Sequence, residues 1–277
     1  MELPNLRIIP LSQTHIHELT LDKPARRIAD LIAHSGLQRN PIIAAEVDGE
    51  YIVIDGMHRF AALKRLNCNG IVACIVDYFD DSIELKGWYL SLDNLSSDEL
   101  CAIIERTAPH LERQELPVAE AQKKMVERTA SFGVLARGES CVHVYTPKDG
   151  FDLERFINMD QAVLKAIQEH GTTYRLVGDE PCEKILAADP QCVLLLLRPV
   201  YRKQEVVERA LADKLFPPKS TRHVIPGRPL RLDIPLSILR SDLTTEQMDR
   251  ILCEETRNRW KLQKIRHYPE PVFIYDE

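Results

Sequence analysis

The pattern of apolar and polar positions in the first eighty residues predicts a compact unit in which strands and helices alternate. Apolar residues at helical spacing predict helices from Asp22 up to Gly36 and from Met57 to Leu66. Pro10 places the first strand at the edge of a sheet, and Asp48-Gly49 predicts a hairpin turn. Four apolar runs predict the strands, at Leu6–Leu11, Ile42–Ala44, Tyr51–Ile54 and Ile71–Tyr78.

The rest of the chain shows the same alternation, which predicts an α/β fold overall. The charged segment Pro109–Pro117, bracketed by prolines, predicts a boundary, with one domain at 1–108 and a second at 109–277. Helices are predicted from Ser96 or Ser97 to Arg106 and at Val118–Thr129, Asp152–Gln168, Arg202–Leu211 and Thr244–Gln263. Strands are predicted at Cys141–Tyr145, Gly171–Val177, Val193–Leu197 and Val272–Tyr275.

Composition narrows the class of protein. The chain has 277 residues, of which 44% are hydrophobic and 28% charged, a composition typical of soluble globular proteins. Its formal charge of −6 weighs against a surface that coats nucleic acid. No apolar run approaches a membrane span and no signal-peptide pattern opens the chain, so a cytoplasmic location is expected. The seven scattered cysteines are expected to be reduced and mostly buried.

The most informative turn is Asp55–Arg59, where a predicted strand ends and a helix begins. The first amide groups of a helix lack intrahelical partners, and the helix dipole adds positive charge, so the position suits a phosphate. Arg59 adds donors, and Asp55 could hold Mg²⁺ or a substrate hydroxyl. Most strand–Asp-Gly–helix turns are only turns. However, His58 and Arg59 in the first helical turn oppose the dipole unless an anion lies there, which favours the phosphate site.

Two other stretches carry polar side chains of interest. In Phe216–Pro226, the five residues from Lys219 to His223 are polar or cationic without an acid, so composition alone supports an anion site and a surface loop equally. The spacing of His15 and His17 suggests a metal site. No third ligand is evident nearby, and a solvated loop with Glu18 as an exposed acid is the favoured interpretation.

Two of these motifs resemble those of a known family. The run IDGMHRFAALKRL resembles the D-G-H-x-R-x-x-A-L box of the ParB/sulfiredoxin-like fold. The run FPPKSTRHVIP, followed by Arg228-Pro229-Leu230 and by PLSIL, resembles the free L-serine kinases. The resemblance implies a ParB/sulfiredoxin-like nucleotide-binding domain at 1–108. It also implies a mixed α/β domain at 109–277 that contributes the loop 216–226, with the active site in the cleft between the two domains.

The resemblance also implies an activity and residue roles. The reaction would transfer a phosphoryl group from ATP or ADP, with Mg²⁺, to the hydroxyl of L-serine and give O-phospho-L-serine. Glu18 would be the catalytic base, and Asp55 would orient the serine hydroxyl or bind Mg²⁺. Nucleotide phosphates would bind at Gly56, Met57, His58 and Arg59, although many relatives have His or Thr in place of Met57. Serine or the transferred phosphate would bind at Trp88, Lys219, Ser220, Thr221, Arg222 and His223.

Alternative functions fit less of the chain. A ParB-like nucleotide-dependent DNA-binding or regulatory protein would explain the Asp55–Arg59 box, but the net charge and the absence of a helix-turn-helix pattern after the box weigh against it. A sulfiredoxin-like reductase needs a reactive cysteine beside the box, whereas Cys68 follows at the far end of the helix. The expected partners are therefore L-serine and a nucleotide, without nucleic acid or membrane. The product could feed cysteine synthesis or diaminopropionate supply for a siderophore, and the oligomeric state is left open.

Overall fold

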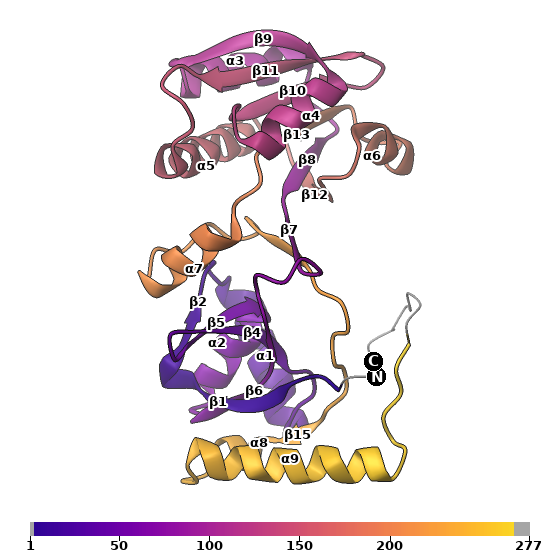
Figure 1. The fold of residues 1–277 in the computed structure, drawn as a ribbon. Helices are drawn as coiled ribbons and strands as arrows, with labels where there is room; N and C mark the ends of the chain where they lie inside the picture. The colour runs from indigo at the N-terminus through magenta and orange to yellow at the C-terminus, as the bar shows by residue number, and fades with distance from the viewer. Residues whose placement is uncertain (1–2, 269–277) are drawn as a thin grey trace. The chain divides into compact units, whose positions relative to one another are not determined.

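The computed structural model describes residues 3–268, so the strand predicted at Val272–Tyr275 lies outside the described residues. Contacts divide the described chain into two units. Unit 1 contains residues 3–83, 207–215 and 225–268, and unit 2 contains residues 84–206 and 216–224. The mixed helices and strands of both units confirm the predicted α/β fold class (Figure 1).

Unit 1 is built on a five-stranded mixed sheet in the order β1-β6-β4-β5-β2. The β2–β5 and β4–β6 pairs are parallel, and the other two pairs are antiparallel. The strands of this sheet are β1 (Leu6–Pro10), β2 (Thr14–Ile16), β4 (Ile42–Val47), β5 (Glu50–Asp55) and β6 (Gly70–Val76). The helices are α1 (Asp22–Ser35), α2 (Met57–Arg65), α8 (Leu236–Leu239) and α9 (Thr245–Lys261), with the short turn η1 (Leu11–Gln13) and the strand pair β3 (Leu37–Gln38) and β15 (Ile234–Pro235).

Strand β1 lies at the sheet edge, as Pro10 predicted, and α9 covers it. The Asp249 carboxylate on α9 accepts a hydrogen bond of 2.7 Å from the Ile8 amide. Met248 and Leu252 of α9 join the same hydrophobic core as Ile8. The C-terminal helix therefore satisfies and buries an edge that would otherwise be open to pairing with another strand.

The hairpin between β4 and β5 turns at the predicted dipeptide. Asp48 has φ of 52° and Gly49 has φ of 84°. Two consecutive residues in the left-handed region are what a two-residue hairpin with the twist of its strands requires, and Asp-Gly supplies them at low cost. The turn aligns β5 so that its last residue, Asp55, lies directly before α2.

Unit 2 is built on a six-stranded sheet in the order β12-β8-β13-β10-β11-β9, with every pair antiparallel. Its strands are β8 (Trp88–Leu92), β9 (Leu111–Pro117), β10 (Phe132–Ala136), β11 (Cys141–Pro147), β12 (Tyr174–Gly178) and β13 (Leu194–Leu197), and β7 (Glu84–Lys86) pairs separately with β14 (Arg222–Val224). Its helices are α3 (Ser97–Thr107), α4 (Val118–Glu127), α5 (Leu153–Glu169) and α6 (Cys182–Ala188), and α7 (Lys203–Leu211) spans a boundary between the units.

Helices cover both faces of the unit 2 sheet. On one face, Met125 of α4 and Ile185 of α6 pack against alternate residues of the central strands, such as Leu195. On the other face, Phe132 of β10 meets Phe156 of α5 with ring centroids 5.8 Å apart. The apolar run of β13 is buried on both faces for this reason, because adjacent strand residues point to opposite sides.

The two contact units divide the chain at positions other than residue 108, and the predicted domains stay a prediction. Residues 84–108 belong to unit 2 because β8 pairs with β12 and β13, and residues 225–268 return to unit 1. The segment Pro109–Pro117, read as a linker, contains the edge strand β9. Four successive residues of this strand, Glu112 to Glu115, are exposed. Because an exposed edge strand carries polar and charged side chains, its composition resembles that of a linker.

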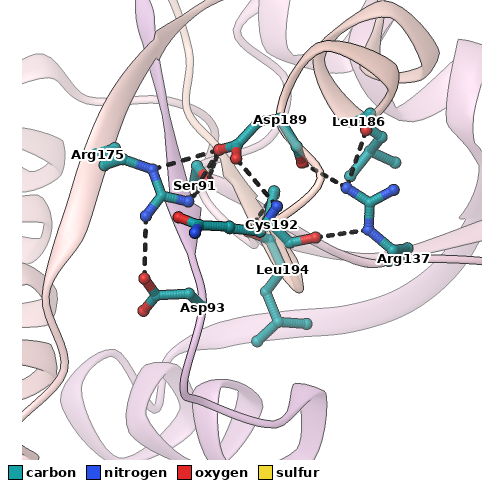
Figure 2. A network of polar contacts seen from close by, with 9 residues as sticks. Ser91, Asp93, Arg137, Arg175, Leu186, Asp189, Cys192 and Leu194 are labelled. Carbon is teal, nitrogen blue, oxygen red and sulfur yellow. Dashed lines mark hydrogen bonds and ion pairs between the residues drawn. The ribbon is translucent and has the colours of Figure 1, made fainter.

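A polar network holds the end of β13 and the chain after α6 to the sheet of unit 2 (Figure 2). Arg175 donates to Asp93, Asp189 and Ser91 at distances of 2.9 to 3.3 Å. Arg137 donates to the carbonyl oxygens of Leu186, Asp189 and Cys192, and so satisfies acceptors that the end of α6 and the following turn leave open. These contacts are structural because each donor already has a partner.

Candidate functional site

Strand pairing brings the end of β2 close to the end of β5. In the parallel pair β2–β5, Thr14 lies opposite Tyr51 and Ile16 opposite Val53. Glu18 follows the last paired residue of β2 by two positions, and Asp55, two positions after Val53, ends β5 next to the start of α2. Ligand sites in α/β sheets form preferentially at this edge.

The solvated loop predicted around His15 and Glu18 was wrong. Glu18 is buried, and His17 is fully buried with its Nδ1–H donated to the Val53 carbonyl oxygen at 2.8 Å. Burial lowers the pKa of His17 to about 4, and the backbone hydrogen bond opposes this only in part, so the ring is neutral at pH 7. The described residues hold no group of three or more His, Cys, Asp or Glu side chains that could bind a metal.

Gly56 makes the turn from β5 into α2. Its φ of 99° lies in the left-handed region, and a Cβ there would lie 2.8 Å from Arg59 and from the Ile42 side chain. Only glycine fits this position. As the N-cap residue, Gly56 has no side chain with which to cap the helix that begins at Met57, and such a helix start is suited to an anion.

Two arginines converge on Asp55. Arg59 donates to the Asp55 carboxylate at 2.8 Å, and Arg228 forms an ion pair with the same oxygen at 3.4 Å. Burial lowers the pKa of Arg59, and Asp55 opposes the shift. The Nε–H of Arg59 is buried and donates to no partner among the described residues. Two guanidinium groups on one carboxylate give the turn a net positive charge, which suits a phosphate.

The other two residues of the predicted turn have separate roles. His58 Nε2 accepts a hydrogen bond from the Leu21 amide at 3.3 Å, which ties the start of α2 to the start of α1. The Met57 side chain is partly buried and packs against the hydrophobic core of unit 1. A side chain in the core leaves the backbone amide as the group that Met57 can offer to a ligand.

A second cluster lies in unit 2, around Trp88 and Arg222. Trp88 donates its Nε1–H to the Thr221 carbonyl oxygen at 3.0 Å. The Arg222 guanidinium carbon lies 5.5 Å from the centre of the Trp88 ring, within the range of a cation–π contact. The β14–β7 pairing sets Arg222 opposite Lys86. The structure thus brings together three of the predicted substrate-binding residues.

The remaining predicted residues of the loop 216–226 differ in exposure. Ser220 is buried, and its hydroxyl donates to the Pro217 carbonyl oxygen at 2.8 Å, which closes the Pro-Pro-Lys-Ser turn. Lys219 is exposed and takes a left-handed φ of 63° within that turn. His223 is half-buried in β14.

Sequence reasoning missed three residues that complete these clusters. Arg228 was noted only as part of the Arg-Pro-Leu motif, and nothing local links it to Asp55. Asp179 and Glu180 contact Arg222 at 3.7 and 3.4 Å but lie in a stretch without a recognised pattern. The available signal was an acidic pair directly after Gly178, the last residue of a strand.

Comparison with known proteins found no matching family model. Over 226 residues the chain is 26% identical to the ATP-dependent L-serine kinase of Staphylothermus marinus, covering 81% of this chain and 87% of that protein. Over 237 residues it is 25% identical to the ADP-dependent L-serine kinase SerK of Thermococcus kodakarensis, covering 83% and 91%. The chain is a homologue of proteins named L-serine kinases.

The solved structures agree on the fold. The structure of a free serine kinase in complex with AMP matches with a TM-score of 0.67 at 24% sequence identity, over 86% of this chain and 95% of that one. The resemblance predicted from the sequence motifs is therefore confirmed. Among the helices that the structure describes, none has the length and apolar character needed to cross a membrane.

Proposed function

We propose that the protein is a free L-serine kinase that transfers a phosphoryl group from ATP or ADP to the serine hydroxyl. The observation that carries the proposal is that the parallel strands β2 and β5 end two residues before Glu18 and at Asp55, which directly precedes the turn into α2. A proton acceptor next to a phosphate-binding turn is what phosphoryl transfer to a hydroxyl requires. The named activities of the homologues support the same reaction.

The nucleotide phosphates bind at the start of α2 in this proposal. The backbone amides of Gly56, Met57 and His58 and the guanidinium of Arg59 supply donors, and the helix dipole adds to their positive charge. The buried Nε of Arg59 gains the hydrogen bond that the protein alone does not give it. Arg228 approaches the same turn through Asp55 and adds to its positive charge.

The residues present fit Mg²⁺. This ion is commonly bound through one or two carboxylates together with substrate phosphates and water. Asp55 offers such a carboxylate, since the contacts of both arginines are to its Oδ2 atom. When bound, Mg²⁺ would neutralise part of the charge on the phosphates. Asp55 is thus either its ligand or the group that orients the serine hydroxyl.

The serine half of the reaction draws on unit 2. Arg222 binds a carboxylate through its guanidinium, and Trp88 holds that group in place through its ring face. Thr221, Lys219 and His223 supply further donors to the serine carboxylate or to the transferred phosphate. Ser220 supports them by closing the turn.

Glu18 accepts the proton of the serine hydroxyl as the oxygen attacks the terminal phosphorus. The bond from phosphorus to the bridging oxygen of the nucleotide breaks, and the products are O-phospho-L-serine and a nucleotide shorter by one phosphate. Burial of Glu18 keeps bulk water from the proton acceptor, so hydrolysis does not compete with transfer to serine.

The direct test is incubation with ATP or ADP, Mg²⁺ and single free amino acids, followed by mass spectrometry of the products. O-phospho-L-serine should form only with L-serine present, and comparison of the two donors identifies the preferred nucleotide. Absence of turnover with both donors, together with DNA binding that weakens with salt, would contradict the proposal and favour the ParB-like alternative.

The role of Glu18 has its own test. Glu18→Gln should lower kcat by about 100- to 10,000-fold, the usual contribution of a general base, while nucleotide affinity stays near that of the wild type. Glu50→Gln is the matched control in the same unit, because Glu50 pairs with His15 on the neighbouring strand. Equal loss of nucleotide binding and turnover in Glu18→Gln would show that Glu18 is not the base.

A further inference from the structure

The acidic pair beside Arg222 has no assigned role. Antiparallel pairing sets Gly178, the last residue of β12, opposite Trp88, the first residue of β8. The chain therefore leaves the sheet at Asp179 next to the start of β8, and the Gly87 amide donates to Asp179 Oδ2 at 3.0 Å. Sheet topology thus fixes Asp179 beside Arg222.

The contacts of Arg222 use only one of its nitrogens. Asp179 and Glu180 both approach Nη1, at 3.7 and 3.4 Å, which is longer than a close charge-assisted hydrogen bond. Among the hydrogen bonds between described residues, the Arg222 side chain donates only the one from Nη1 to Glu180, so its Nε and Nη2 are available. That edge of the guanidinium carries two parallel N–H groups, the fork that binds a carboxylate through both oxygens.

The acids, in turn, are incompletely paired. Asp179 Oδ1 is buried and accepts no hydrogen bond within the described part of the chain. Lys86, opposite Arg222 in the strand pair, is bound to Glu84 at 3.0 Å and also interacts electrostatically with Glu180 and Asp179. Counting Glu84, three carboxylates face the two cations Lys86 and Arg222, which leaves an excess negative charge beside an open carboxylate fork.

We infer that Asp179 and Glu180 bind the α-ammonium group of the amino-acid substrate while the Nε–Nη2 edge of Arg222 binds its α-carboxylate. The ammonium and carboxylate groups of an amino acid are attached to the same carbon and therefore lie close together. The acidic pair and the open Nε–Nη2 edge of Arg222 likewise belong to one small cluster. An ammonium group supplies the donors that the buried Asp179 Oδ1 atom lacks. The inference rests on the proposed kinase function and adds the residues that select an amino acid over a plain hydroxy acid.

Substrates with and without the ammonium group test this role. L-serine and 3-hydroxypropionate share the hydroxyl and the carboxylate, and only serine has the α-ammonium. Asp179→Asn, Glu180→Gln and the double variant keep the size of each side chain and remove its charge. Loss of one charge-assisted contact should lower kcat/KM for L-serine about tenfold or more, while the value for 3-hydroxypropionate, or its inhibition constant against serine, stays within about twofold.

Asp93→Asn is the matched control. It removes an acid that contacts Arg175 in the same unit and should leave the preference for serine unchanged. Glu180 is almost half exposed, so Glu180→Gln is expected to fold even if Asp179→Asn does not. An unchanged ratio of kcat/KM values in folded Glu180→Gln and double variants overturns the inference alone. Absence of serine turnover in the wild-type protein would instead overturn the proposed function.

Discussion

Unit 2 contains two arginines that each face two acids, and they differ in how far their donors are used. Arg175 donates from all three of its nitrogens, to Asp93, Asp189 and Ser91 (Figure 2). These hydrogen bonds raise the pKa of Arg175. Arg222 contacts its two acids through Nη1 alone. The first arginine is complete without a ligand, and the second is not.

The difference distinguishes Arg175, a structural residue, from Arg222, the proposed ligand-binding residue, within unit 2. A guanidinium whose donors are all satisfied gains nothing from a new partner, so a ligand would have to displace existing bonds. An arginine held by a tryptophan face and two distant acids keeps its fork available. Donor use therefore distinguishes the two clusters better than charge, since both contain one guanidinium and two nearby carboxylates.

The largest effect is expected at a third pair, Arg198 and Asp160, which is both paired and buried. Asp160→Asn leaves the Arg198 charge buried without its partner, and should lower the free energy of unfolding by about 3–5 kcal/mol in urea denaturation. The double variant Asp160→Leu/Arg198→Met should recover most of that loss, because it removes both charges together. A double variant less stable than Asp160→Asn would show that the pair itself stabilises the fold.

The next effect concerns the open arginine. Arg222→Lys keeps the positive charge near Asp179 and Glu180 but removes the planar fork, so kcat/KM for L-serine should fall roughly 10- to 100-fold. Steady-state kinetics and thermal unfolding are measured on the same preparation. A lower Tm with unchanged kinetics would place Arg222 with Arg175 as a structural residue and remove the distinction.

A smaller kinetic effect is expected from a substitution at Gly178, which packs against the Arg222 guanidinium. A Cβ at Gly178 would lie 2.5 Å from Arg222 Nη1, so the guanidinium must move in Gly178→Ala. The shift should raise the KM for L-serine by roughly three- to tenfold, on the order of 1 kcal/mol. The same change in the Arg222→Lys background should add little, because coupled residues do not contribute independently. Additive effects would mean that Gly178 acts through another group.

The smallest effect is expected at the saturated arginine. Arg175→Gln removes an ion pair that is partly exposed to solvent, and such pairs contribute little to stability. Thermal unfolding should show a slight decrease in Tm, and the KM for L-serine should equal that of the wild type. A rise in KM comparable to that of Arg222→Lys would contradict the assignment of this network to structure.

Short motifs of neighbouring residues predicted several local features of the structure. Asp48-Gly49 and Asp55-Gly56 each fix a local turn, and the structure has a hairpin and a helix start at these places. The motif around Arg222 pointed to an anion site. Each of these depends on a few neighbouring residues, whose backbone preferences are local.

What the sequence did not predict depends on pairing across long distances. The parallel β2–β5 register brings the ends of the two strands together ahead of Glu18 and at Asp55, and the β8–β12 register brings Asp179 close to Trp88. Neither register can be read from the residues on one strand alone. For a related reason, the polar edge strand β9 resembles a linker until its partner β11 is known.

The pairing of β2 with β5 also makes the number of residues between Thr14 and Glu18 important for the proposed function. Glu18 follows the last paired residue of β2, Ile16, by two positions. A residue inserted between Thr14 and Glu18 would therefore shift its carboxylate relative to Asp55 at the end of β5. In the proposed reaction, this spacing matters as much as the glutamate itself.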